Sequence, residues 1–149
     1  MLFRSAIDGD KTGDPAPTGS FEKLGGGLTS LSAYQGKPVV LNFFASWCVP
    51  CRNEMPDLQK VHTQLGDKVA FLGLAVRDAT KDVADFVHTT GASYDIARDP
   101  AGKMFSDLGG LNMPTTFFVS ASGRIVGVHP GALNASDLQK LVNQYFHAS

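Results

Sequence analysis

The stretch that decides the fold is residues 45–56, ASWCVPCRNEMP, and it contains both cysteines of the chain, Cys48 and Cys51. The residues before it, 38–45, form a near-continuous apolar run, which is typical of a strand buried on both faces. The residues after it, 51–65, carry apolar side chains at helical spacing. The cysteine pair is therefore expected where a buried strand passes into a long helix.

That position gives the two cysteines different predicted roles. The first turn of a helix has unpaired N–H groups and a partial positive charge, which stabilise a thiolate and lower the pKa of the thiol. Cys48 precedes the helix and is predicted to be the more exposed sulfur and the attacking nucleophile, with Arg52 adding positive charge nearby. Cys51 is predicted to be the more buried, resolving thiol. A pair so closely spaced can cycle between dithiol and disulfide through a mixed disulfide with a partner.

The rest of the chain alternates strand and helix patterns, which predicts an α/β fold. Further strands are predicted over 69–76, 93–97, 115–120 and 124–128, helices over 82–90, 103–108 and 136–146, a turn over 99–102, and an N-terminal hairpin over 21–24 and 28–31. Helices between buried strands imply a mixed central sheet flanked by helices on both faces.

Length and composition limit the remaining possibilities. A chain of 149 residues suggests one domain, predicted over 21–149, and residues 1–20 have few apolar side chains and are predicted to form a flexible leader or linker. A net charge of −1 argues against a broad nucleic-acid surface. No run reaches the roughly 18 apolar residues of a membrane span, and the first residues lack the apolar core of a signal peptide. We expect that the protein works where it is made, or that a leader or anchor is missing from this chain.

A metal site is the main alternative explanation for two cysteines at this spacing. A structural zinc site needs two more ligands, and the four histidines, at positions 62, 88, 129 and 147, form no close pair. We therefore predict no metal and no cofactor. An inert structural disulfide is a second alternative, but so short a loop would restrain the unfolded chain little.

Residues 45–56 resemble the active-site segment of the thioredoxin superfamily, and more narrowly that of the extracytoplasmic TlpA/ResA-like thiol–disulfide oxidoreductases. Three further stretches agree: residues 36–43 resemble the strand leading to the site, 113–117 the cis-proline loop, and 123–126 with Gly131 the closing hairpin. The similarity runs from about residue 21 to residue 146. It implies a thioredoxin-like three-layer sandwich.

The resemblance also implies roles for residues around the cysteines. Trp47 and Pro50 would belong to a surface on which substrate proteins dock. Pro114 would be cis and lie against the disulfide, leaving the backbone of Met113 free to pair with an extended substrate segment. Glu54 stands where ResA-like members carry a functional acid, and it could relay the proton of Cys51. The alternative for Glu54 is a solvated helix carboxylate.

One residue departs from thioredoxin itself. Thioredoxin has a buried Asp in the strand before the active site, and Asn42 stands at that position here. Because Asn cannot take a proton, the acid–base relay of thioredoxin is not available. This departure favours Glu54 as the acid.

The resemblance implies a thiol–disulfide oxidoreductase that acts on cysteine-containing client proteins and is recycled by a membrane or soluble redox partner. It further implies an extracytoplasmic, monomeric protein without nucleic-acid partners, used as a reductant in protein or cytochrome c maturation. An extracytoplasmic oxidant that forms disulfides is an alternative. A peroxiredoxin is a weaker one, since Ala45 stands where that enzyme needs Thr. A non-enzymatic copper carrier lacks a set of His or Met ligands.

Overall fold

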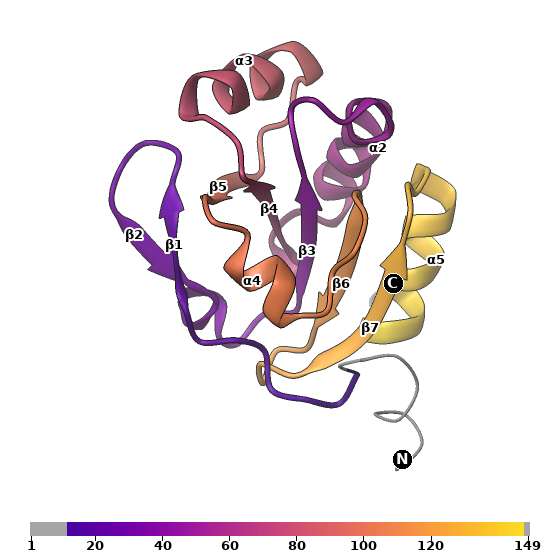
Figure 1. Ribbon diagram of the computed structural model, residues 1–149. Helices are drawn as coiled ribbons and strands as arrows, with labels where there is room; N and C mark the ends of the chain where they lie inside the picture. The colour runs from indigo at the N-terminus through magenta and orange to yellow at the C-terminus, as the bar shows by residue number, and fades with distance from the viewer. Residues whose placement is uncertain (1–11, 148–149) are drawn as a thin grey trace.

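The computed structural model describes residues 12–147, whose strands form one sheet with helices around it (Figure 1). The strands are β1 (Ser20–Lys23), β2 (Leu28–Ser30), β3 (Val39–Phe44), β4 (Ala70–Val76), β5 (Asp95–Asp99), β6 (Thr115–Val119) and β7 (Ile125–Pro130). The helices are η1 (Leu31–Tyr34), α2 (Val49–Leu65), η2 (Gly66–Lys68), α3 (Thr80–Thr90), α4 (Lys103–Asp107) and α5 (Ala135–Phe146). The predicted order of strands and helices is confirmed, including the N-terminal hairpin.

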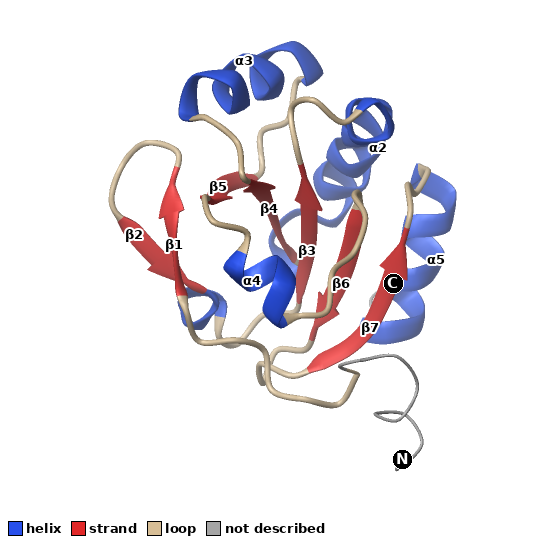
Figure 2. Cartoon of the chain, in the orientation of Figure 1, coloured by secondary structure: helices blue, strands red, loops and turns tan. Residues whose placement is uncertain are grey.

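The sheet is mixed, with strand order β2-β1-β5-β4-β3-β6-β7. Strand β3 pairs in parallel with β4 and antiparallel with β6, so it lies near the middle of the sheet. All six residues of β3 are buried. Their side chains alternate between two cores, because Val40 and Phe44 pack with α2, α3 and α5 while Leu41 and Phe43 pack on the side of α4. The predicted three-layer α/β sandwich is thus confirmed (Figure 2).

Several boundaries differ from the predicted ones, and each has a local reason. Helix α2 begins at Val49 rather than residue 51, since Cys48 is its N-cap and Pro50 fits the first turn of a helix. Strand β5 begins at Asp95 rather than residue 93, because the N–H of Ser93 donates to Gln59 Oε1 of α2 (2.8 Å) and not to the sheet.

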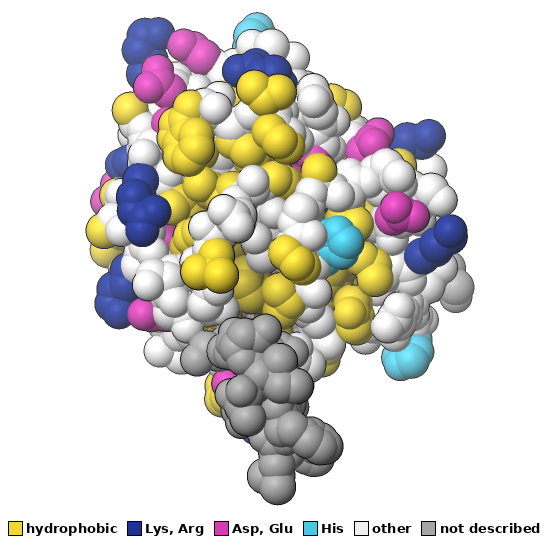
Figure 3. Space-filling model, turned by 45° about the vertical axis from the view of Figure 1, so that its right-hand side comes forward, with side chains coloured by type: hydrophobic (Ala, Val, Ile, Leu, Met, Phe, Trp, Pro, Cys, Tyr) yellow, Lys and Arg dark blue, Asp and Glu magenta, His cyan; other side chains and the backbone are white. Residues whose placement is uncertain are grey.

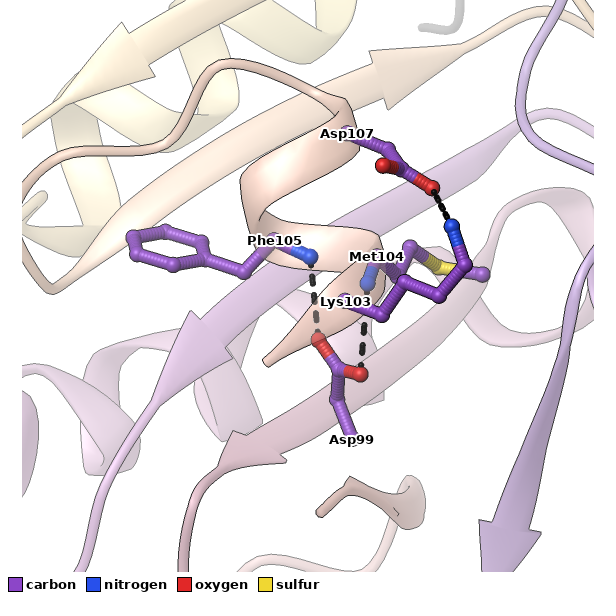
Figure 4. A network of polar contacts seen from close by, with 5 residues as sticks. All are labelled: Asp99, Lys103, Met104, Phe105 and Asp107. Atoms are coloured by element: carbon purple, nitrogen blue, oxygen red, sulfur yellow. Dashed lines mark hydrogen bonds and ion pairs between the residues drawn. The ribbon is translucent and has the colours of Figure 1, made fainter. Parts of the chain in front are cut away.

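The predicted turn over 99–102 begins too early. Asp99 is the last residue of β5, and its carboxylate accepts hydrogen bonds from the backbone N–H groups of Met104 (3.3 Å) and Phe105 (2.9 Å) (Figure 4). These are N–H groups that a helix leaves unpaired at its start. Asp99 therefore anchors α4 to the end of β5, and the exposed Lys103–Asp107 ion pair lies on the outer side of that helix.

Part of the predicted leader is bound to the sheet. The N–H of Gly13 donates to the carbonyl of Ile125 (2.6 Å), and the N–H of Ile125 donates to the carbonyl of Asp14 (2.9 Å). Ala16 donates to the carbonyl of Gly123 (2.8 Å), in the turn between β6 and β7. Residues 1–11 lie outside the described residues, and the domain limits remain a prediction. Within residues 12–147, no helix is long and apolar enough to cross a membrane.

Candidate active site

Cys48 and Cys51 form a disulfide at the start of α2, with their Cα atoms 5.3 Å apart. Cys48 is the N-cap residue, and its sulfur accepts the backbone N–H of Cys51 at 3.3 Å. The sulfur of Cys48 therefore lies where the helix presents an unpaired N–H group and its partial positive charge. Both cysteines are buried, and Cys48, at 7% exposed, is more accessible than Cys51, at 1%, which is the predicted order.

The loop before β6 lies against the disulfide. The sulfur of Cys48 is 3.7 Å from the carbonyl oxygen of Met113, and the Met113–Pro114 peptide bond is cis. The loop is held on both sides: Thr115 Oγ1 donates to the carbonyl of Asn112 (2.6 Å), and Gly131 donates to the carbonyl of Pro114 (2.8 Å). The start of α2 and the loop before β6, which are far apart in the sequence, thus both contact the sulfur of Cys48.

Apolar side chains are exposed around this sulfur. Trp47 and Val49, on either side of Cys48, are each 65% exposed, and Leu111, in the loop that leads to Met113, is 89% exposed. They are three of the four large hydrophobic side chains that are exposed among the described residues. Pro50 is exposed beside them. Figure 3 shows hydrophobic side chains gathered on the upper part of one face, with charged side chains mainly at its margins.

Glu54 is buried beneath the active-site turn, so it is not the solvated carboxylate of the alternative. It is 2% exposed; its Oε1 accepts from Asn42 Nδ2 (3.0 Å), and its Oε2 accepts from the N–H of Leu133 (2.8 Å). Burial raises the pKa of Glu54 from 4.5 to about 7, while these two hydrogen bonds oppose the shift. A carboxyl with a pKa near neutrality, three residues after Cys51 on the same helix, is suited to exchange a proton with that thiol.

The sequence did not predict a clamp on the loop that carries Trp47 and Cys48. Ser46 donates through its backbone N–H and its hydroxyl to the two carboxylate oxygens of Asp78, at 2.5 Å and 2.9 Å. Arg52 Nη2 donates to the carbonyl of Ser46 at 3.5 Å, and its guanidinium lies 4.9 Å from the centre of the Phe86 ring. Arg52, which was predicted to place positive charge beside the cysteines, thus also helps to hold Ser46 in place.

A signal for this clamp does exist in the chain. Ser46 stands two residues after the end of β3, and Asp78 stands two residues after the end of β4. Because these strands are parallel neighbours, their carboxyl ends meet at one edge of the sheet. Arg77, which links the end of β4 to Asp78, has a φ of 51°, so its backbone adopts the left-handed conformation. The contact between Ser46 and Asp78 could therefore have been predicted from the sequence, because each residue lies two positions after the end of one of two neighbouring parallel strands.

We expect that Asp78→Ala loosens the active-site loop and lowers the free energy of unfolding by about 1–3 kcal/mol, because two donors of Ser46 lose a charged acceptor. Trp47 is the only tryptophan in the chain, so its fluorescence anisotropy should fall as the loop gains freedom. The matched control is Asp85→Ala on the adjoining helix, which removes only an exposed pair with Lys81. Equal anisotropy in both variants would contradict the clamp.

A central sheet covered by helices on both faces, with a Cys-x-x-Cys disulfide at a helix start beside a cis-proline, defines a dithiol–disulfide protein of the thioredoxin fold. The chain belongs to the Redoxin family, whose model matches residues 11–144. Its site is that of a thiol–disulfide oxidoreductase acting on cysteine-containing proteins.

Individual proteins agree with this assignment. The chain is 32% identical over 135 residues to thioredoxin-like protein YneN of Bacillus subtilis, covering 89% of this chain and 79% of that protein. It is 32% identical over 139 residues to thiol-disulfide oxidoreductase ResA of Oceanobacillus iheyensis, covering 89% and 72%. A solved thiol:disulfide interchange protein of the thioredoxin family from Chlorobium tepidum matches with a TM-score of 0.78 and 30% identity, covering 91% of this chain and 98% of that one.

Proposed function

We propose that this protein is an extracytoplasmic reductant that delivers two electrons from the Cys48–Cys51 dithiol to a disulfide of a client protein, in protein or cytochrome c maturation. The observation that carries disulfide exchange at this pair is the placement of Cys48, which is the more exposed of the two cysteines and whose Sγ accepts a helix N–H at 3.3 Å. This placement favours a thiolate at Cys48 once the disulfide is reduced. The direction of electron flow is supported by the ResA-like pattern of the active-site segment.

The reaction takes place in two exchanges. The Cys48 thiolate attacks one sulfur of the client disulfide; a mixed disulfide forms, and one client thiolate leaves. The Cys51 thiolate then attacks the sulfur of Cys48, releases the second client thiolate and leaves the Cys48–Cys51 disulfide. The proton of the Cys51 thiol passes to the carboxylate of Glu54 and from there to the departing client thiolate. Two electrons reach the client, and a redox partner must return two electrons to this protein.

Client recognition rests on the apolar surface and on the loop before β6. An extended client segment would pair its backbone with Met113 beside Pro114, in the manner of an added strand. Trp47 and Pro50, with Val49 and Leu111, would cover the apolar side chains that flank the client cysteine. We propose a monomer that meets its clients and a membrane or soluble redox partner through this one surface.

The reduction potential of the Cys48–Cys51 pair tests the direction of electron flow. We expect a value near or below that of thioredoxin, about −270 mV, measured by equilibration with glutathione or dithiothreitol buffers. A value near about −120 mV, as in a strong disulfide-forming oxidant, would reverse the proposed direction and make the protein an oxidant. Insulin reduction in the presence of dithiothreitol provides a second readout of exchange with protein disulfides.

A further inference from the structure

A buried polar cluster lies beneath the disulfide, and one of its atoms has no partner. It joins Asn42 of β3, Glu54 of α2, Thr116 of β6 and the backbone N–H of Leu133, which precedes α5. Asn42 is 2% exposed and Thr116 is fully buried. The amide nitrogen of Asn42 donates both its hydrogens, to Glu54 Oε1 at 3.0 Å and to Thr116 Oγ1 at 3.1 Å. Its carbonyl oxygen, Oδ1, is buried without a hydrogen-bond donor.

The observed hydrogen bonds suit only the charged form of Glu54. Oε1 faces the amide of Asn42 and Oε2 faces the N–H of Leu133, so both oxygens accept and neither has an acceptor for a proton. The backbone N–H of Leu133 cannot become an acceptor for a proton on Glu54. The side-chain amide of Asn42 can, because it carries an oxygen as well as a nitrogen.

A half-turn of the Asn42 amide resolves this conflict. The turn exchanges Oδ1 and Nδ2 with almost no change in shape, so the packing around the side chain is preserved. Oδ1 then accepts the proton of the neutral Glu54 carboxyl. The hydroxyl of Thr116 can donate as well as accept, and it rotates to donate to the same oxygen. One polar atom of Asn42 lacks a partner in either orientation, so the turn does not increase the number of buried polar atoms without a partner.

We propose that Asn42 is a positioning residue whose side-chain amide turns over with the charge of Glu54, presenting its nitrogen to the carboxylate and its oxygen to the carboxylic acid. The inference rests on the proposed function, in which Glu54 takes up and releases a proton in each cycle. It gives a physical reason for an amide at this position: an ionised Asp would accept only, and a leucine would neither donate nor accept.

Other titratable groups also face the cluster. Asp57, one turn further along α2, raises the pKa of Glu54 through charge repulsion. Tyr94, before β5, is buried with an unpartnered hydroxyl, and its own pKa is raised by burial and by the charge of Glu54. His129 of β7 lies opposite Thr116 in the sheet register. Cys51 joins these groups when the disulfide is reduced, so the experiment must follow Glu54 and Asn42 directly.

Nuclear magnetic resonance of the full chain can follow both groups in one titration. The carboxyl carbon of Glu54 reports its protonation, and the side-chain NH₂ of Asn42 reports the amide orientation through cross-relaxation with Thr116. Above the pKa of Glu54, the NH₂ protons should lie beside Thr116, and below it that contact should weaken with the same midpoint. Asn143, whose exposed side chain accepts from Gln139, is the internal reference and should not respond. An unchanged Asn42 contact across the Glu54 transition would overturn the inference.

Variants separate this inference from the proposed relay. Asn42→Leu should raise the midpoint of the Glu54 titration by about one pH unit or more, because the carboxylate loses a hydrogen-bond donor. In Glu54→Gln the Asn42 signals should become independent of pH. If Asn42 turns with Glu54 while Glu54→Gln leaves the pH–rate profile of disulfide exchange unchanged, the relay fails and the inference stands. If the profile shifts while Asn42 stays fixed, the inference fails and the relay stands.

Discussion

Cys48→Ser should reduce the rate of disulfide exchange to the uncatalysed level. Cys48 is the more exposed of the two cysteines, at 7% against 1% for Cys51, and its sulfur accepts the N–H of Cys51, so Cys48 is expected to attack first. A serine hydroxyl at this position keeps the helix cap but is no nucleophile toward sulfur near neutral pH. The measurement is insulin reduction, or the reduction of a small aromatic disulfide followed by absorbance. Retained activity would mean that Cys51 attacks first.

Cys51→Ser should have the opposite signature. Attack by Cys48 remains possible, but the thiolate that resolves the mixed disulfide is missing, so an adduct with the client accumulates. Mass spectrometry or a non-reducing gel detects this adduct, which dithiothreitol should reverse. Because the chain has only two cysteines, the double variant with both replaced by serine is a complete control and should form no adduct. An adduct in Cys48→Ser but none in Cys51→Ser would invert the two assignments.

The elements that could be predicted from the sequence are those whose signals are local. The apolar run of β3 and the helical spacing in α2 determine these two elements, and the cysteine pair falls at their junction. The relative exposure of the two sulfurs follows from that junction alone. The cap of α5 also has a local signal: Asn134 is a short polar residue just before the helix, and in the structure its side chain accepts the N–H of Asp137 at 2.8 Å.

The polar partners of the site depend on pairing between distant strands, and local pattern does not contain that information. Asn42 and Thr116 are 74 residues apart and meet because β3 and β6 pair in one particular register. A shift of that register by one residue would turn Thr116 to the other face of the sheet. Ser46 and Asp78 are 32 residues apart and meet only because β3 and β4 end together. The resemblance implied an acid at Glu54 and left a solvated carboxylate open; the burial that decides between them depends on contacts with Asn42 and Leu133, which local pattern does not contain.

The burial of Glu54 makes the stability of the folded protein depend on pH. Burial raises the pKa of the Glu54 carboxyl from 4.5, its value in an unfolded chain, to about 7 in the folded protein. Between these values the folded protein holds a proton that the unfolded chain has released, so the protonated carboxyl favours folding. Its contribution is present in full below the unfolded pKa and is lost as pH rises through the folded pKa. The shift corresponds to about 3 kcal/mol.

Glu54→Gln should therefore flatten the dependence of stability on pH. In wild type, the free energy of unfolding attributable to Glu54 should fall by about 3 kcal/mol between mildly acidic and mildly basic pH, because the cost of burying the carboxylate exceeds what its two hydrogen bonds return. A glutamine side chain cannot ionise, so the variant should be the more stable protein above neutrality. Urea denaturation of the oxidised proteins at a series of pH values measures the difference. The exposed carboxylate of Asp67 provides the control, and Asp67→Asn should keep the wild-type slope. Parallel curves for wild type and Glu54→Gln would mean that Glu54 does not hold its proton in the folded state, and its part in the proton relay would fall with that result.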